Sequence, residues 1–464
     1  MAESNHIVGA AGEPGVEAFG YKQELKRALS LWDLLFYGLV FISPIAPFGV
    51  FGFVYNASHG MPPLVYAVGL IAMLFTAFSY VAMSRAFPVA GSVYAYAGRG
   101  IGESAGFLAG WAILLDYLLL PTLVYVGASV TMTVVLPGVP KPVWVVVFLV
   151  FNTVVNLIGI ETTALLNKIL LALQIMVLAV FVGFAVYGLQ HGVAGAHLSW
   201  APLWDSAKVT PALVFGALSF AALSFLGFDA ISTLSEEAKG GARSVGWATI
   251  LSLVLAATLF IGQTYLASLF VLGRDHFPPG DGTANAFLTV ANIMGGPILQ
   301  NVTAVLGLLL SALAGALAAQ AATARLLYSM ARDGKLPRFL AHVDARRKTP
   351  QRAVLLVAAI TLLLGLAMVD HLQLIISLVN FGALFGFLTL HLSVVWYFLI
   401  RRRTGRWFAH LLSPALGFAV IAYVLYNADH LAKIAGLTWL AVGVVVLVVL
   451  KLKGQSAALP VDEV

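Results

Sequence analysis

Acidic side chains occur within stretches of sequence that are apolar enough to lie in lipid. Asp229 follows Ser224 and Gly227 inside one such stretch, and Asp116 lies inside another. A carboxylate at membrane depth is energetically costly, so it marks a functional site by default. Irregular backbone is tolerated at that depth only where it lines a cavity or is buried in protein. The small residues before Asp229 therefore predict a helix that opens there.

The composition assigns the chain to the polytopic membrane proteins. Of its 464 residues, 61% are hydrophobic and 10% are charged, whereas soluble proteins carry about 25% charged residues. The apolar runs have the length of helices and lack the short alternation of β-barrel strands. Cysteine is absent, which excludes disulfides and thiolate metal sites. We find no metal-ligand spacing of histidines, no phosphate-binding glycine loop and no catalytic constellation, so we expect no enzyme and no cofactor.

We expect an all-α polytopic membrane protein with twelve transmembrane helices and no separate soluble domain. The predicted spans are residues 32–55, 63–84, 92–121, 143–160, 164–189, 211–235, 245–272, 298–330, 352–369, 372–400, 408–427 and 431–450. The third span either ends at Pro121 or continues as a kinked helix to about Val135. Residues 283–296 are expected to form a short extracellular helix. Residues 1–28 have no hydrophobic signal-peptide core and are predicted to be a cytoplasmic tail.

The basic residues favour a topology with both termini in the cytoplasm. This topology puts 22 of the 26 Lys and Arg residues inside, as the positive-inside rule requires. The four outside are Lys141, Lys208, Arg274 and Lys433. We interpret the basic clusters at 332–352 and 401–406 as topology signals and lipid contacts, and we expect no nucleic-acid partner.

The first and sixth predicted spans are both interrupted near their centres. In the first, Pro44 and Pro47 lie three residues apart, and each removes a helical hydrogen bond and clashes with the preceding turn. We expect an unwound segment there; the alternative is a simple proline kink. A pair of broken helices in corresponding halves indicates an inverted-repeat transporter, although we find no residue-level repeat.

The paired breaks suggest how the chain is divided. Residues 29–190 form a first repeat of five spans, and residues 211–400 form a second, inverted one. Two further helices follow at 401–451, and a cytoplasmic tail is expected at 452–464.

Three motifs, in this order, resemble the amino acid–polyamine–organocation permeases. They are AFPVAGSVYAYAGRGIGESAGFLAGW (86–111), SFLGFDAISTLSEEAK (224–239) and ARLLYSMARDGKLPRFLAHV (324–343). The resemblance extends over residues 28–450, and within the family GWAILLDYLLLPTL (110–123) looks most like bacterial putrescine importers. It implies a leucine-transporter-like fold, with five plus five inverted helices and two more, in the bacterial inner membrane. It also implies alternating access around a site at the membrane midplane.

The substrate class follows from a departure from the family pattern. Amino acid permeases of this family hold the substrate carboxylate on a glycine-rich break in the first helix. The matching run here is Ile45-Ala46-Pro47, in which proline has no N–H and the other two lack the freedom of glycine. A weakened anion site, together with Asp116, favours a cationic amine without a carboxylate. Alternatively, Asp116 is an interfacial or cytoplasm-side residue that is paired within the protein.

The resemblance places Asp229 at the position of the acid that senses protons in related exchangers. A buried carboxylate can load and release a proton as a cavity alternates, so we expect proton coupling through Asp229 or Asp116. The alternative role of Asp229 is to cap the second half of the broken helix. The family's fifth-span lysine is replaced by Gln174, which cannot titrate. Sodium coupling stays open.

Further candidates surround the predicted site and its cytoplasmic side. The predicted substrate-binding residues are Ser43, Ile45, Ala46, Asp116, Tyr117, Ser224, Phe225, Gly227 and Asn380. The two aromatics could stack on an alkylammonium or simply pack, and Asn380 could bind substrate or join helices. A cytoplasmic gate is predicted from Lys26, Arg27, Glu236, Glu237 and Arg325. The alternative for these charges is a solvated cluster.

Together these features predict a secondary active importer for a small, putrescine-like amine, driven by protons. Three alternatives stay open: a proton symporter for neutral or cationic amino acids, an antiporter that exchanges amine for amino acid, and a channel or nutrient sensor. We expect a monomer or a homodimer within the lipid bilayer.

Overall fold

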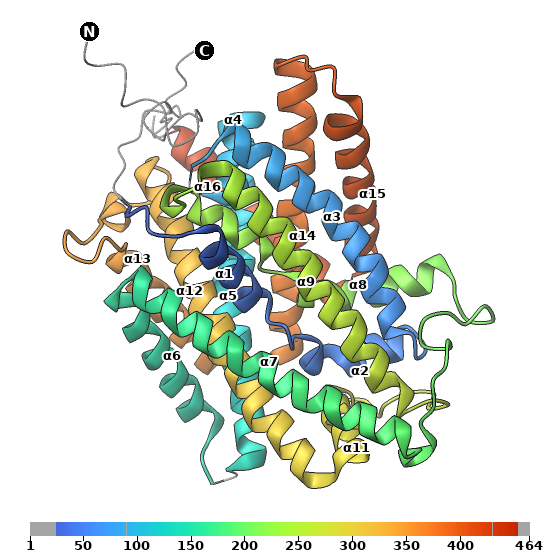
Figure 1. Cartoon of the computed structure of the whole chain (residues 1–464). Helices are drawn as coiled ribbons and strands as arrows, with labels where there is room; N and C mark the ends of the chain where they lie inside the picture. The colour runs from blue at the N-terminus through green and yellow to red at the C-terminus, as the bar shows by residue number, and fades with distance from the viewer. Residues whose placement is uncertain (1–24, 90, 137, 429, 453–464) are drawn as a thin grey trace.

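The computed structural model describes residues 25–89, 91–136, 138–428 and 430–452. In this part of the chain the structure is helical, apart from one isolated bridge between Leu29 and Ala238 (Figure 1). Most of the two predicted tails, namely residues 1–24 and 453–464, lies outside the described residues.

The helices confirm an all-α protein with many membrane spans. Among the described residues, nine helices are long and apolar enough to cross a membrane, and a bent helix pair makes a tenth. The nine are Pro62–Ala86 (α3), Glu103–Val130 (in α5), Lys141–Ile158 (α6), Leu165–Gln190 (in α7, Ile160–Gln190), Pro211–Glu237 (α8 and η4), Gly241–Leu269 (α9), Leu374–Arg401 (in α14, Leu372–Val395, and η7, Trp396–Arg401), Phe408–Tyr426 (η8, Phe408–Leu412, and α15, Ser413–Tyr426) and Lys433–Leu452 (in α16, His430–Leu452).

The count of twelve spans stays a prediction. The two predicted spans outside this set correspond to α12 (Leu309–Arg332) and to α13 (Gln351–Ala367), which has only 17 residues. The remaining short elements are η3 (Val193–Gly195), α10 (Asp281–Ala284), α11 (Ala286–Val302), η5 (Thr303–Leu308) and η6 (Arg338–Ala341).

Both predicted interruptions are present. The first span divides into α1 (Leu31–Ile42) and α2 (Pro47–Ala57), which are bent by 54°. The chain is therefore unwound between them rather than merely kinked. The sixth span divides into α8 (Pro211–Phe225) and the 3₁₀ helix η4 (Phe228–Glu237). Gly227, with φ 116°, marks this break, whereas Ser224 belongs to the last turn of α8.

The predicted third span, 92–121, is wrong at its beginning. Residues Ser92–Gly100 form a separate helix, α4, and the span itself is α5 (Glu103–Val135), which continues through Pro121. Helix α4 folds back closely on α5: a Cβ added at Gly106 would lie 2.5 Å from the Cα of Gly98. Two glycines thus allow a helix–helix contact that a single continuous helix could not make.

The expected short helix at 283–296 is also found. Helix α11 begins at Ala286, and its helical geometry is interrupted at Gly295 and Gly296. Its extracellular location stays a prediction. Beyond this interruption the chain continues through η5 into α12.

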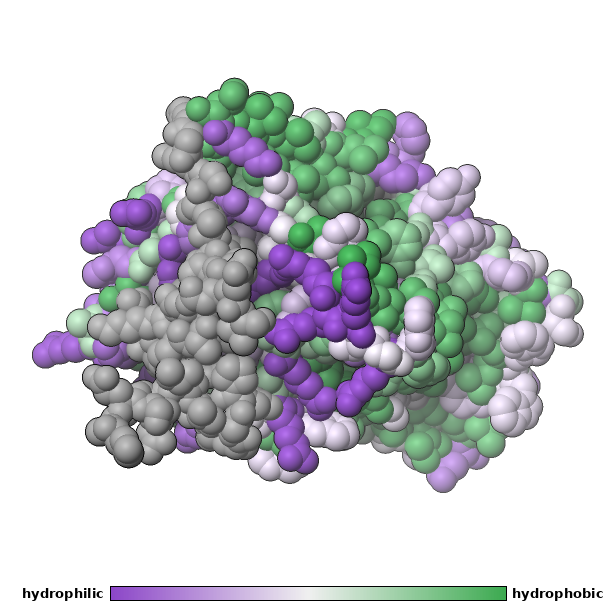
Figure 2. Space-filling view, turned by 90° about the horizontal axis from the view of Figure 1, so that it is seen from above, coloured by the Kyte–Doolittle hydropathy of each residue, from purple (hydrophilic) through white to green (hydrophobic). Residues whose placement is uncertain are grey.

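The helices are arranged around a buried centre. Helix α5 is the most enclosed of the candidate spans, with 78% of its apolar window buried, whereas α16 has only 11% buried. Figure 1 shows α3 running beside α9 across one side of the bundle. At the end seen in Figure 2, hydrophilic side chains gather near the centre, while hydrophobic ones gather at the top and to the right of the centre. An apolar outer surface is what a lipid bilayer requires.

A pair of tryptophans joins the exposed helix α16 to α5. The Nε1–H of Trp111 donates to the carbonyl of Trp439 at 2.9 Å, and the Nε1–H of Trp439 donates to the carbonyl of Trp111 at 2.7 Å. Their rings stack with centroids 4.8 Å apart. Gly443 allows this approach, because a Cβ there would lie 2.4 Å from the Trp111 ring.

We expect Trp439→Phe to loosen α16, because it keeps an aromatic ring and removes the indole donor. The loss of one buried hydrogen bond should cost about 1 kcal/mol. The measurement is the thermal unfolding midpoint of the purified protein in detergent. Trp200→Phe is the control, since Trp200 is 80% exposed. Equal midpoints for the two variants would show that the indole pair does not hold α16.

Candidate functional site

A cavity of about 230 Å³ lies between the two interrupted helices. Its walls come from the unwound segment and α2, from the end of α8, and from α5, α10, α12 and α14. The lining is apolar except for three side chains, those of Ser43, Ser224 and Asn285, and none of the lining residues is charged. The cavity is thus a mainly apolar chamber into which two helix breaks open.

Only part of the predicted set of substrate-binding residues lines this cavity. The lining members are Ser43, Ile45, Ala46 and Ser224. The members outside the lining are Asp116, Tyr117, Phe225, Gly227 and Asn380. Asn285, which the sequence did not single out, is a lining residue because the segment between α9 and α11 reaches back over α2.

The two interruptions touch each other at Gly227. A Cβ at this position would lie 2.1 Å from Cδ1 of Phe41 and 3.0 Å from the backbone nitrogen of Ile42. Its φ of 116° is also one that residues other than glycine rarely adopt. Glycine is therefore required here, both by the backbone conformation and by the packing of one broken helix on the other.

Asp229 is buried at the start of η4, directly beyond this contact. Its Oδ2 accepts a hydrogen bond of 2.6 Å from the hydroxyl of Tyr117, and its Oδ1 accepts one of 3.2 Å from the N–H of Gly227. The second bond satisfies the N–H of Gly227 directly before η4, so Asp229 lies where its alternative role as a helix-capping acid requires. Capping and proton transfer are compatible, because the carboxyl group keeps a second oxygen that faces Tyr117.

Asp116 is buried one helical turn before Leu120, the first α5 residue of the cavity lining. Its Oδ1 has no hydrogen-bond partner among the described residues. Helix α14 packs tightly against it, since a Cβ at Gly382 would lie 2.7 Å from the Asp116 nitrogen. Asp116 is therefore enclosed between α5 and α14, and its depth in the membrane, at the midplane or on the cytoplasmic side, stays a prediction. The next residue along α5, Tyr117, is bonded to Asp229, which puts both acidic residues beside the same part of α5.

Two buried amides hold the unwound segment, and one of them was missed from the sequence. Ser43 donates its hydroxyl to Oε1 of Gln174 at 3.0 Å. Nε2 of Gln263, on α9, donates to the carbonyl of Pro44 at 2.8 Å. A break in a helix leaves carbonyls without their usual donors, and Gln263 supplies one. A single amide inside the apolar stretch 245–272 was the signal that could have found it.

The other predicted residues have packing roles in this conformation. Phe225 is fully buried between Tyr66 and Phe260, with ring centroids 5.8 and 5.6 Å away. Asn380 donates from Nδ2 to the carbonyl of Ser219 at 3.3 Å. This bond joins α14 to α8, which agrees with the helix-joining alternative for Asn380.

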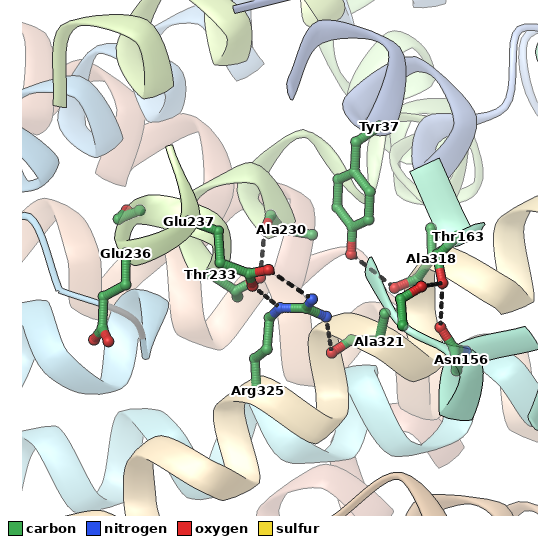
Figure 3. A network of polar contacts seen from close by, with 12 residues as sticks. Tyr37, Asn156, Thr163, Ala230, Thr233, Glu236, Glu237, Ala318, Ala321 and Arg325 are labelled. Carbon is green, nitrogen blue, oxygen red and sulfur yellow. Dashed lines mark hydrogen bonds and ion pairs between the residues drawn. The ribbon is translucent and has the colours of Figure 1, made fainter. Parts of the chain in front are cut away.

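On the far side of the breaks, charged groups close the structure. The guanidinium of Arg325 donates to both carboxylate oxygens of Glu237 and to the carbonyl of Ala321 (Figure 3). Arg325 is 4% exposed and Glu237 1%, so this is a buried ion pair. The backbone adds further bonds, because the N–H groups of Ala28 and Leu29 donate to the carbonyl of Glu237 at 3.1 and 3.0 Å.

The remaining predicted gate residues are Glu236, Lys26 and Arg27. Glu236 pairs with Arg332 at 2.8 Å, a partner that the sequence did not suggest. Lys26 and Arg27 are exposed beside the bridge before α1. A further ion pair joins Lys335 to Glu103. The alternative of a solvated charge cluster is wrong for both glutamates, since each is 1% exposed.

Comparisons with known proteins agree with the motifs. The amino acid permease family matches residues 29–450. The chain belongs to this family. The resemblance to amino acid–polyamine–organocation permeases is therefore confirmed, and with it a transporter fold made of membrane-spanning helices.

Individual relatives extend over nearly the whole chain. It is 35% identical to the low-affinity putrescine importer PlaP of Escherichia coli K12 over 431 residues, which are 91% of this chain and 93% of that protein. It is 27% identical to the branched-chain amino acid permease BcaP of Bacillus subtilis, over 93% of this chain and 94% of that protein. The methylthioribose transporter of Bacillus subtilis is 26% identical, with 91% and 93% covered.

We expect Arg325→Ala to open the charged end of this permease, because it leaves Glu237 buried without a cation. Breaking one side of a buried pair costs about 3–5 kcal/mol. The chain has no cysteine, so a single cysteine in place of Ser235, which is 5% exposed, reports opening by its rate of thiol labelling in detergent. The rate should rise at least tenfold, since that needs only about 1.4 kcal/mol.

Arg346→Ala is the matched control for this experiment, since Arg346 is exposed on a loop. It should leave the labelling rate at Ser235→Cys unchanged. If Arg325→Ala labels no faster than this control, the ion pair does not hold that end closed.

Proposed function

We propose that this permease imports a small cationic amine, with putrescine as the first candidate, by alternating access and with protons as the coupling ion. The relative PlaP, a putrescine importer by name, supports the substrate class. The observation that carries the proposal is the orientation of the helix ends around the cavity. Helices α1 and α8 both end there, at Ile42 and Phe225, and a helix C-terminus has negative polarity that favours a cation.

The opposite helix ends are less suited to an anion. Helix α2 begins with Pro47, which has no N–H to offer a carboxylate. The N–H of Gly227 at the start of η4 already donates to Asp229. A substrate carboxylate would therefore meet few free donors, whereas an ammonium group would meet two carbonyl ends. This polarity suits an amine without a carboxylate.

The two buried carboxyl groups are the candidates for proton coupling. Asp229 is held by Tyr117 and Gly227, while Asp116 has an oxygen without a partner. Both lie beside the cavity without lining it, so an ammonium group in the cavity would act on them through space. Arrival of a cation beside these groups would favour the ionised form of a carboxyl group and so release a proton.

The asymmetry of the structure supports alternating access. The end that holds Arg325 and Glu237 is closed by buried ion pairs, and the cavity lies on the other side of the helix breaks. With the predicted cytoplasmic termini, the closed end faces the cytoplasm and the cavity is reached from outside. The relatives come from bacteria, which supports a location in the inner membrane. The inverted repeats 29–190 and 211–400 belong to this proposal.

A second candidate substrate is a branched-chain amino acid. The apolar lining of the cavity and the relative BcaP favour it. Uptake of labelled putrescine and labelled leucine into proteoliposomes, with and without an inward proton gradient, separates the two. Concentrative uptake of leucine alone would remove the amine proposal. Counterflow of amine against preloaded amino acid would indicate an antiporter.

We expect Asp229→Asn to abolish uptake of putrescine against its gradient while downhill exchange continues, because the amide cannot carry a proton. The readout is the accumulation ratio in proteoliposomes under a proton gradient. Asp370→Asn is the control, because Asp370 is exposed and pairs with Lys141 at the surface. Full accumulation in Asp229→Asn would end the assignment of Asp229 as proton carrier.

We expect Asp116→Asn to raise the KM for putrescine about tenfold, which corresponds to about 1.4 kcal/mol of lost attraction for the ammonium group. The carboxylate lies one turn, about 6 Å, from the cavity lining, so its charge acts without direct contact. Initial uptake rates over a range of putrescine concentrations measure the change. An unaltered KM would show that Asp116 does not contribute to the binding of the amine.

A further inference from the structure

Among the three polar residues of the cavity lining, Asn285 is the one whose side chain has no hydrogen-bond partner in the described part of the chain. Ser43 is bonded to Gln174, and Ser224 lies 2.9 Å from the hydroxyl of Tyr66. The amide of Asn285 makes no hydrogen bond within the described part of the chain, and the residue is half-buried. In a chamber that is otherwise apolar, an amide with free donors and a free acceptor points to a ligand group that needs them.

The fold fixes Asn285 at a distance from the helix breaks. The loop that precedes it is bonded to α2 through Asn56. Its Oδ1 accepts from the N–H of Phe277 at 2.8 Å, and its Nδ2 donates to the carbonyl of the same residue at 2.9 Å. A Cβ at Gly52 would lie 2.1 Å from the carbonyl oxygen of Thr283, which shows how closely this segment approaches α2.

The position along α2 gives the separation. Gly52 follows Ala46, at the unwound segment, by six residues, and a rise of 1.5 Å per residue puts it about 9 Å further along the helix. Asn285 lies two residues after Thr283, at the level of Gly52. The cavity therefore has a polar end at the helix breaks and a second polar end at Asn285. Between them are apolar side chains such as Val50, Leu123 and Val124.

We propose that Asn285 binds the second ammonium group of a short aliphatic diamine, whose first ammonium group lies at the carbonyl ends of α1 and α8. This rests on the proposed import of amines and specifies which amines are preferred. The amide oxygen accepts hydrogen bonds from an ammonium group, and the apolar wall between the two ends suits a chain of methylene groups. A monoamine fills the first position only and leaves Asn285 without a partner.

The test compares a diamine with a monoamine of the same chain length. Putrescine uptake into proteoliposomes gives its KM, and inhibition of that uptake by butylamine gives the Ki of the monoamine. We expect Asn285→Ala to raise the KM for putrescine about tenfold, as for a lost hydrogen bond to a charged group, while the Ki of butylamine stays unchanged. Asn285→Asp should lower the KM for putrescine and leave butylamine unaffected.

The control and the contrary outcomes are distinct. Asn427→Ala removes the same side chain from an exposed helix end, where it donates to the carbonyl of Tyr423, and it should change neither constant. An equal loss for both amines in Asn285→Ala, or no loss for either, overturns the role of Asn285. If the alanine variant does not fold, a reduced preference for the diamine in Asn285→Asp overturns it. Absence of putrescine uptake by the unaltered protein refutes the proposed function itself, and this role with it.

Discussion

The structure depends on one constraint, that backbone polar groups released inside a membrane must find partners within the protein. The two interrupted spans meet this requirement with one side chain from another helix and one from within the broken span itself. Gln263 on α9 donates to the carbonyl of Pro44, and Asp229 accepts from the N–H of Gly227. Buried amides and acids in otherwise apolar helices are therefore explained by the breaks that they serve. Any carbonyl left over is available to a ligand in the cavity.

The interruptions are also coupled by packing. Because Gly227 lies against Phe41 and the backbone of Ile42, neither broken helix can rotate at this point without displacing the other. The segments that flank the two interrupted spans meet again at the charged end, where the Lys239 N–H donates to the carbonyl of Leu29 at 2.8 Å. A change in one half of the molecule is thus transmitted to the other at two levels, by a steric contact and by a hydrogen-bonded bridge.

The helix breaks could be predicted from the local sequence. The position of Asp116 relative to the cavity and the ion-pair partner of Glu236 could not. Two prolines in the first span and a glycine in the sixth predict where each helix is interrupted. Asp116, by contrast, lies on α5 one turn before Leu120, where the cavity lining begins. Gly382 of α14 packs against its backbone there, so the carboxyl group is buried between two helices. The partner of Glu236 was equally hidden, since only the folded chain brings Arg332 beside it. The backward fold of α4 likewise required knowledge of a contact between two glycines.

An apolar cavity beside buried charges has a consequence for selectivity. Since no charged residue lines the chamber, the proposed amine substrate would form no direct ion pair there and would be stabilised by helix ends and by the fields of nearby carboxyl groups. Such stabilisation is weaker than a contact pair, but it spares the cost of breaking one when the substrate leaves. A carboxylate that touched the amine would bind it more tightly and also hold it back. In the proposed mechanism, Asp116 and Asp229 lie beside the cavity without lining it, so both groups could respond to the charge of a substrate amine and exchange protons without holding the amine in a direct ion pair.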